Sequence, residues 1–153
     1  MKNDLVLAIE TAPVSVNARS MSQDELEHVR RRFGSDLPEW FLQAMLDAAL
    51  FGTIYEYSAE GVFARLSWLT GNEMIDEAEI YPGIDAVANG YIPVGTCTEG
   101  SGDSYFVCFR SSDDPPLVQI YHDMTRNGEV PEGALRTITT KLSIFFQQAV
   151  VLS

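Results

Sequence analysis

Residues 90–109 read GYIPVGTCTEGSGDSYFVCF, and the prediction of the fold starts from this stretch. Two apolar segments with strand character flank a short loop that holds Gly100 and Gly102. The glycines give this loop access to positive φ, and Asp103 can accept hydrogen bonds from nearby backbone amides in an Asx-type turn. We therefore predict a tight bend that starts a strand, and Pro93 predicts that the preceding strand lies at a sheet edge.

Two functional interpretations of this loop compete with the structural one. A phosphate-binding loop would need a following lysine, or a following helix in the dinucleotide-binding case, and Glu99 would repel phosphate. A hydrolase could use Ser104 with His122 and either Asp103 or Asp123. However, adjacent strand residues face opposite ways and no GxSxG elbow is present. We therefore expect no enzyme, with the hydrolase kept as the alternative.

The segments before this stretch predict two helices and then a hairpin. Ser22 and Glu25 form a capping box at the start of a helix that Gly34 ends. A second helix has Pro38 in its first turn and is expected to end at Gly52. Residues 52–58 and 62–70 are rich in β-branched and aromatic side chains, which predicts two strands joined by a turn at 58–61.

The remaining segments complete the set of expected elements. Residues 5–9 have weak strand character, and residues 72–90 predict one or two short helical turns in a long connection. Residues 117–123 are the returning strand of a second hairpin, after the turn DDPP. An apolar residue recurs at helical spacing near the C-terminus, which predicts a four-turn helix packed on the sheet through Leu135, Ile138, Leu142, Phe145 and Ala149.

This order of elements predicts an α+β fold. We expect an antiparallel sheet of about four to six strands, covered by two N-terminal helices and a C-terminal amphipathic helix. Residues 1–20 are expected to form an N-terminal segment with an extra strand or a loop, and residues 21–153 the domain itself.

Composition limits the class of protein. The chain has 153 residues, of which 46% are hydrophobic, and it contains no apolar run of the roughly 18–20 residues that span a membrane. Its first residues lack the pattern of a secretory signal, so we expect a cytoplasmic protein. Cys97 and Cys108 could meet across the turn, but we expect them to stay reduced. Two cysteines without nearby histidines do not form a zinc site, and we expect no metal and no cofactor.

Charge is the most informative bulk property. The formal net charge is −12, and residues 51–100 hold eight acids against Arg65 as their one base. Such a surface repels nucleic acid and attracts basic partners, although a solvated acidic face is the common plain explanation. The candidate partner-binding residues are the five acids of segment 73–85 and two acids of the loop, namely Glu73, Asp76, Glu77, Glu79, Asp85, Glu99 and Asp103.

Four features in this order resemble the SUKH superfamily, bacterial immunity-type domains related to a yeast cell-wall-synthesis regulator. They are Leu37-Pro38 with Phe41, the stretch IPVG at 92–95, the sequence GDSY at 102–105, and the closing helix from about Ala134. Members often carry Asn-Gly after the first of these, where this chain has Phe51-Gly52.

The resemblance, which covers residues 22–150, implies a non-enzymatic role. It implies an immunity protein that binds and neutralises a cognate toxin, and the acidic surface fits a basic nuclease-type toxin domain. The alternative is a regulatory protein-interaction scaffold without a toxin partner, as the eukaryotic members imply.

Overall fold

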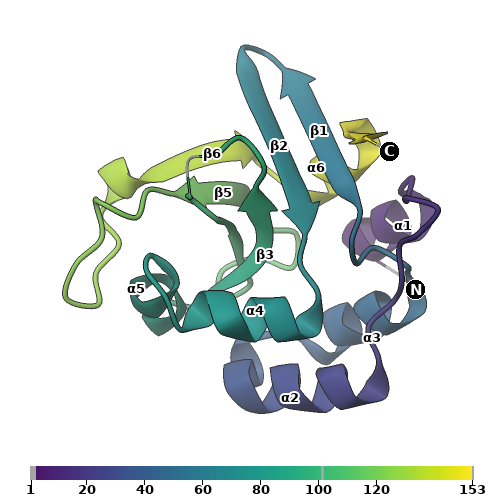
Figure 1. Ribbon diagram of the computed structural model, residues 1–153, viewed down its shortest axis with the longest axis horizontal. Helices are drawn as coiled ribbons and strands as arrows, with labels where there is room; N and C mark the ends of the chain where they lie inside the picture. The colour runs from purple at the N-terminus through teal and green to yellow at the C-terminus, as the bar shows by residue number, and fades with distance from the viewer. Residues whose placement is uncertain (1–2, 101, 153) are drawn as a thin grey trace.

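A curled sheet forms the centre of the computed structural model, which describes residues 3–100 and 102–152 (Figure 1). Within these residues the sheet has seven strands in the order β6-β5-β4-β3-β2-β1-β7, and all neighbouring strands are antiparallel. The strands are β1 (Ile54–Ala59), β2 (Val62–Trp68), β3 (Tyr91–Cys97), β4 (Tyr105–Cys108), β5 (Leu117–Ile120), β6 (Leu135–Thr139) and β7 (Val150–Leu152).

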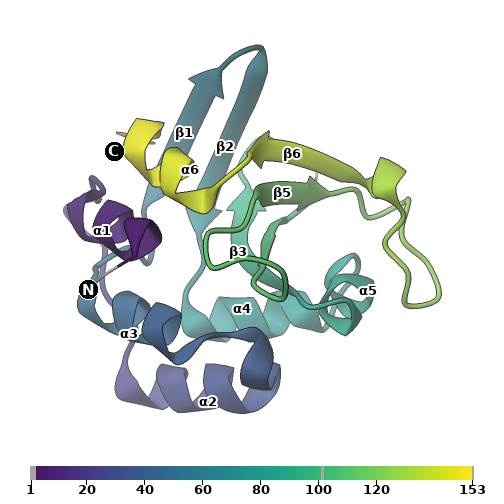
Figure 2. The same cartoon turned by 180° about the vertical axis from the view of Figure 1, so that it is seen from behind.

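Helices pack around this sheet, which confirms the predicted single-domain α+β fold. They are α1 (Asp4–Thr11), α2 (Gln23–Phe33), α3 (Glu39–Asp47), α4 (Gly71–Ala78), α5 (Gly83–Ala88) and α6 (Leu142–Gln148). Figure 2 shows α1, α3 and α6 on the side of the sheet turned toward the viewer, with α2 below them. Among the described residues, no helix has the length and apolar character needed to cross a bilayer.

The sheet buries side chains on both faces. The main core joins the helices to β1–β4 through large side chains such as Tyr55, Trp68 and Phe145, each at most 1% exposed. A smaller cluster on the other face is built around Phe106 and Ala86, so α5 covers the back of β4 and β5. Because strand side chains alternate between faces, residues 105 and 107 enter the main core while 106 enters the smaller one.

The predicted hairpin of β1 and β2 is confirmed. Its turn residues Glu60 and Gly61 have φ of +52° and +81°, as a two-residue type I′ turn requires. The acidic connection also forms the predicted helical turns, as α4 and α5.

The expectation of a strand at residues 5–9 is wrong, because this segment is helix α1. Asn3 caps the helix by accepting from the Val6 amide at 2.8 Å. Leu5, Ala8 and Ile9 are buried at spacings of three and four, which is the helical pattern.

The expectation of an edge position for β3 is also wrong, because β3 lies between β2 and β4 in the middle of the sheet. Proline lacks an amide donor, and the sheet accommodates it through a register shift between Pro93 and Gly95. Gly95 leaves room for Leu66, since an added Cβ would lie 2.4 Å from Leu66 Cδ1 and would displace this side chain.

The prediction of a single C-terminal helix is wrong over the first half of that segment. Residues 135–139 form β6, and among the described residues that follow it α6 is the one helix, with β7 after it. Leu135 packs on the smaller cluster and Ile138 on the main core, so two residues three apart face opposite sides of a strand. The β-branched run TITT favours this extended conformation.

The carboxylate of Glu25 joins three parts of the chain. Its side chain is in the predicted capping box with Ser22, and it accepts from Arg19 Nη1 at 2.6 Å and from Arg19 Nη2 at 3.1 Å. It also accepts from the amide of Gly71, at the start of α4, at 3.0 Å. Hydrogen bonding from Arg19, and then from Ser22, lowers the pKa of Glu25 to about 2 although the residue is only 5% exposed.

Replacing this carboxylate should destabilise the fold in a pH-dependent way. For Glu25→Gln we expect a loss of about 3 kcal/mol in the free energy of unfolding at pH 7. The pKa of Glu25 is lower in the folded chain, so its stabilisation is complete above its ordinary value of 4.5 and is lost as the pH falls toward about 2. Urea unfolding of both proteins at pH 7 and pH 3 measures the difference.

The matched control is Glu27→Gln on the same helix, where an exposed carboxylate pairs with Arg30. It should change the free energy of unfolding by less than about 1 kcal/mol. A Glu25→Gln effect as small as that of the control would contradict the role given to Glu25.

Candidate functional site

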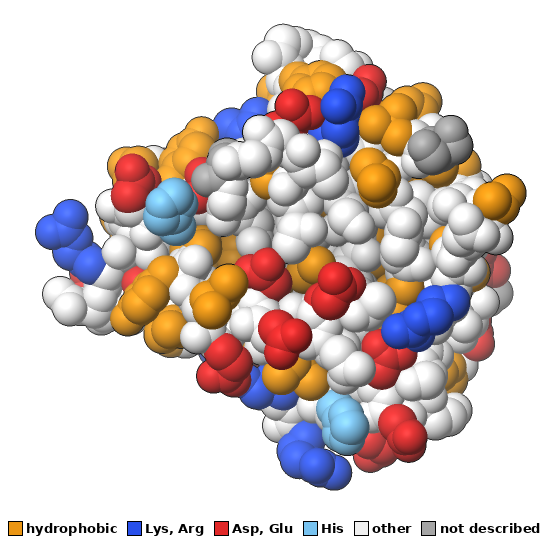
Figure 3. Space-filling view, viewed as in Figure 1, with side chains coloured by type: hydrophobic (Ala, Val, Ile, Leu, Met, Phe, Trp, Pro, Cys, Tyr) orange, Lys and Arg blue, Asp and Glu red, His pale blue; other side chains and the backbone are white. Residues whose placement is uncertain are grey.

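Four of the seven candidate acids lie together on α4 and its C-cap, and we call Glu73, Asp76, Glu77 and Glu79 the acidic surface. Figure 3 shows acidic side chains gathered over α4 on this face, with hydrophobic side chains beside them. Glu73 completes a second capping box with Thr70, so it also fixes the start of the helix. The spacing of Thr70 and Glu73 is the sequence signal that would have located α4.

A hollow of about 290 Å³ opens between these side chains. Glu73, Asp76 and Glu77 supply three carboxylates to its rim. Its remaining walls are Leu69, Ile80 and Thr96, so charge and apolar area meet in one place.

Glu77 connects the acidic surface to the glycine-containing loop. Ser104 Oγ donates to Glu77 Oε2 at 3.0 Å. Burial raises the pKa of Glu77, and the bond from Ser104 opposes this rise. The structure thus brings α4 and the start of β4 together, although 27 residues separate the two side chains.

Asp103 is a buried structural residue. It is 8% exposed, and its Oδ1 accepts from the backbone amide of His122 at 2.8 Å and lies 2.6 Å from His122 Nδ1. This bond and the charge of Asp103 raise the pKa of His122. Gly100 and Gly102 have the predicted positive φ. The carboxylate of Asp103, for which we predicted a local turn, also binds His122, just after β5.

The residues of the hydrolase alternative point to different partners. His122 Nδ1 faces Asp103, whereas the hydroxyl of Ser104 donates to Glu77. Among the hydrogen bonds of the described residues, none joins Ser104 to His122.

The remaining two candidate acids lie apart from the acidic surface. Asp85 is 2% exposed and accepts from the Gly128 amide at 2.8 Å, so its carboxylate holds the loop after β5. Glu99 is exposed and forms an ion pair with Arg65 at 3.3 Å. Asp85 and Asp103 are buried by tertiary contacts, which a local sequence pattern does not indicate. The prediction that they lie on the binding surface is therefore wrong.

Sequence reasoning missed three exposed apolar side chains at the corner between α4 and α5. Ile80, Tyr81 and Ile84 are 54%, 60% and 41% exposed. This corner requires a glycine, since a Cβ on Gly83 would lie 1.9 Å from the carbonyl oxygen of Glu77. The signal in the sequence was the segment EIYPGID, in which apolar residues interrupt the acids.

Cys97 and Cys108 are both half-buried and carry no disulfide. Within residues 3–100 and 102–152, no group of three or more His, Cys, Asp or Glu side chains is arranged to hold a metal ion.

Comparison of the chain with protein-family models, with curated proteins and with solved structures found no match.

The contact between Asp103 and His122 can be tested by titration. In Asp103→Asn the amide oxygen can still accept from the backbone, but the negative charge is lost, so the pKa of His122 should fall toward its ordinary value of 6.5. An NMR pH titration of the imidazole protons measures this value. Asp123→Asn is the matched control and should lower the pKa less, because Asp123 is the weakest of its causes. An unchanged pKa in Asp103→Asn would contradict the described contact.

Proposed function

We propose that this chain is a non-catalytic binding protein of the immunity type, which neutralises a basic, nuclease-type toxin domain in the cytoplasm. The acidic surface on α4 and the apolar corner beside it form the binding face. The observation that carries the proposal is the combination of four acids with Ile80, Tyr81 and Ile84 on one continuous segment.

The exposed apolar corner favours a face that binds a protein over an acidic face that is only solvated by water. Exposed aliphatic and aromatic side chains that adjoin one another are typical of protein interfaces, and tyrosine is enriched among the residues that dominate binding energy. A purely solvated acidic face would have no need of Tyr81 at 60% exposure.

The charge supports a basic partner. A toxin that binds nucleic acid presents a basic cleft to the phosphates, and an acidic protein can occupy the same cleft. Segment 71–90 carries five acids and no base. Among the described residues, the one ion pair formed by these acids joins Glu79 to Arg32 at 3.2 Å. The order of the four sequence features that resemble the SUKH superfamily supports the same role.

The partner can be identified by affinity capture of the tagged chain from its host lysate, followed by mass spectrometry. We expect one dominant basic protein that is toxic when expressed alone and harmless when expressed with this chain. Several substoichiometric partners without toxicity would contradict the proposal and favour the regulatory scaffold.

Variants of the binding face distinguish the contribution of its charge from that of its apolar contacts. Asp76→Lys with Glu79→Lys should slow association with the captured partner by about tenfold at low salt, because electrostatic attraction acts on the encounter. Tyr81→Ala should instead speed dissociation, by about thirtyfold, as expected of a buried aromatic contact. Surface plasmon resonance measures both rates.

The charge-matched control is Asp24→Lys with Glu132→Lys, two exposed acids outside α4. It should change both rates less than twofold. Equal slowing of association by the two double variants would show that only net charge matters, and would contradict the assignment of α4 as the binding face.

A further inference from the structure

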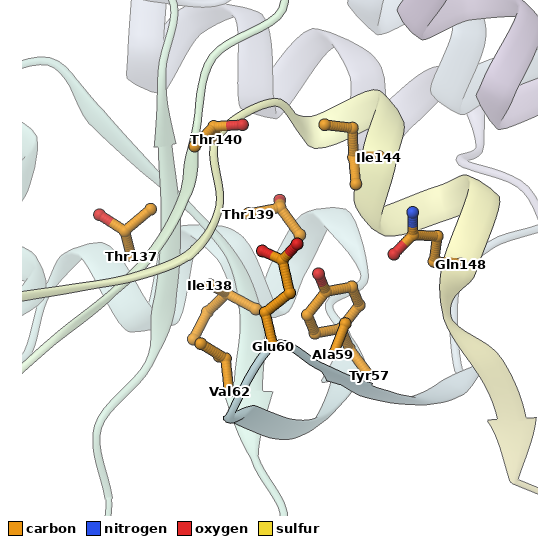
Figure 4. Close-up of a pocket in the computed structure, with 10 residues that line it drawn as sticks. All are labelled: Tyr57, Ala59, Glu60, Val62, Thr137, Ile138, Thr139, Thr140, Ile144 and Gln148. Carbon is orange, nitrogen blue, oxygen red and sulfur yellow. The ribbon is translucent and has the colours of Figure 1, made fainter.

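A second cavity lies at the opposite end of β2 from α4, and the proposed function does not use it. It has a volume of about 470 Å³ and is bounded by the β1–β2 hairpin, β6 and α6 (Figure 4). This size lies within the usual range of small-ligand pockets.

Polar groups from separate elements converge on this cavity. Glu60, from the hairpin turn, and Tyr57, from β1, both line the cavity, and Figure 4 shows the carboxylate of Glu60 pointing toward the side where Thr139 lies. The amide of Gln148 points into the same space from α6, whereas the hydroxyl of Thr137 points away.

The hydroxyl of Thr139 lacks a partner although it is buried. Thr139 is 4% exposed, and its Oγ1 makes no hydrogen bond to any described residue. A buried polar group in this state lowers stability, and native structures retain few of them. Its Oγ1 has less than 1 Å² of accessible surface, so this hydroxyl lies behind the wall of the cavity and outside the reach of a ligand.

Glu60 occupies a backbone position that suits a different residue. It has φ of +52° in the first central position of a type I′ turn, where asparagine, aspartate or glycine is preferred. Non-glycine residues in this conformation are uncommon. The turn holds the Glu60 carboxylate over a cavity whose apolar wall includes Val62, Ile138 and Ile144.

We propose that this cavity binds an alkyl cation, that is, a guanidinium or ammonium group on a short apolar stem. Glu60 is the one charged residue among the ten that line the cavity, so a cation would be paired and an anion repelled. The amide oxygen of Gln148 can accept from another N–H donor of the ligand, and the aliphatic wall packs on the stem. The cation is either a free small molecule or the arginine or lysine side chain of a protein.

The test uses n-butylguanidinium, with n-butylurea as its uncharged analogue of the same shape. In ¹H–¹⁵N NMR titrations we expect saturable shifts of amides in residues 57–62 and 137–148 with butylguanidinium. The urea should bind at least about tenfold more weakly, because it lacks the charge that pairs with Glu60. Absence of saturable shifts in these residues would overturn the proposal.

Matched variants test whether the binding of butylguanidinium depends on Glu60. Glu60→Gln should weaken butylguanidinium binding about tenfold, whereas Asp24→Asn, which removes the same charge from exposed α2, should leave it within twofold. Thr139→Val should leave binding within twofold while keeping or raising the melting temperature, since it replaces an unpartnered hydroxyl that the cavity does not reach with a methyl group. Equal effects of Glu60→Gln and Asp24→Asn would contradict the site.

A peptide titration distinguishes the two sources of the cation. The probe is acetyl-Gly-Ser-Arg-Ser-Gly-amide, with alanine in place of arginine as its control. Arginine-dependent shifts at the same amides would assign the cavity to a protein side chain, whereas binding of butylguanidinium alone would assign it to a free small molecule. Since the partner of α4 is absent from all of these titrations, their outcome does not depend on the proposed function.

Discussion

The buried carboxylate of Glu25 is the interaction on which the rest of the arrangement depends. Its oxygens accept from Arg19 in the N-terminal loop, from Ser22 at the start of α2, and from Gly71 at the start of α4. A buried charge is costly unless it is paired and hydrogen-bonded, so the three segments must assemble together to satisfy it. Gly71 has room for no side chain here, since an added Cβ would lie 2.9 Å from Glu25 Cβ.

This constraint extends from the core to the proposed binding face. Glu25 and the capping box of Thr70 and Glu73 fix the first turn of α4, and Gly83 permits the close turn into α5. Ser104 holds Glu77 from the side of the sheet. The acids and the apolar corner therefore have defined positions before any partner binds, which lowers the entropy lost on association.

Local sequence patterns were sufficient to predict the fold class. They failed where the same apolar residues fit both the spacing of a helix and the alternation of a strand. The capping box at Ser22 and the hairpin turn at residues 58–61 have short-range causes, and both are confirmed. Leu135 and Ile138 fit a helical spacing and also a strand that buries both faces, and only the pairing of β6 with β5 decides between them. The same limit applies to the candidate acids, because Asp85 and Asp103 look like surface residues in the sequence but are buried by tertiary contacts.

The most direct test of the central claim is hydrogen–deuterium exchange of this chain with and without its captured partner. The account predicts that slowing of exchange on binding is largest in residues 71–88, with the β1–β2 hairpin unchanged. Slowing in the hairpin or α1, with residues 71–88 unaffected, would contradict the assignment of the acidic surface and its apolar corner as the binding face.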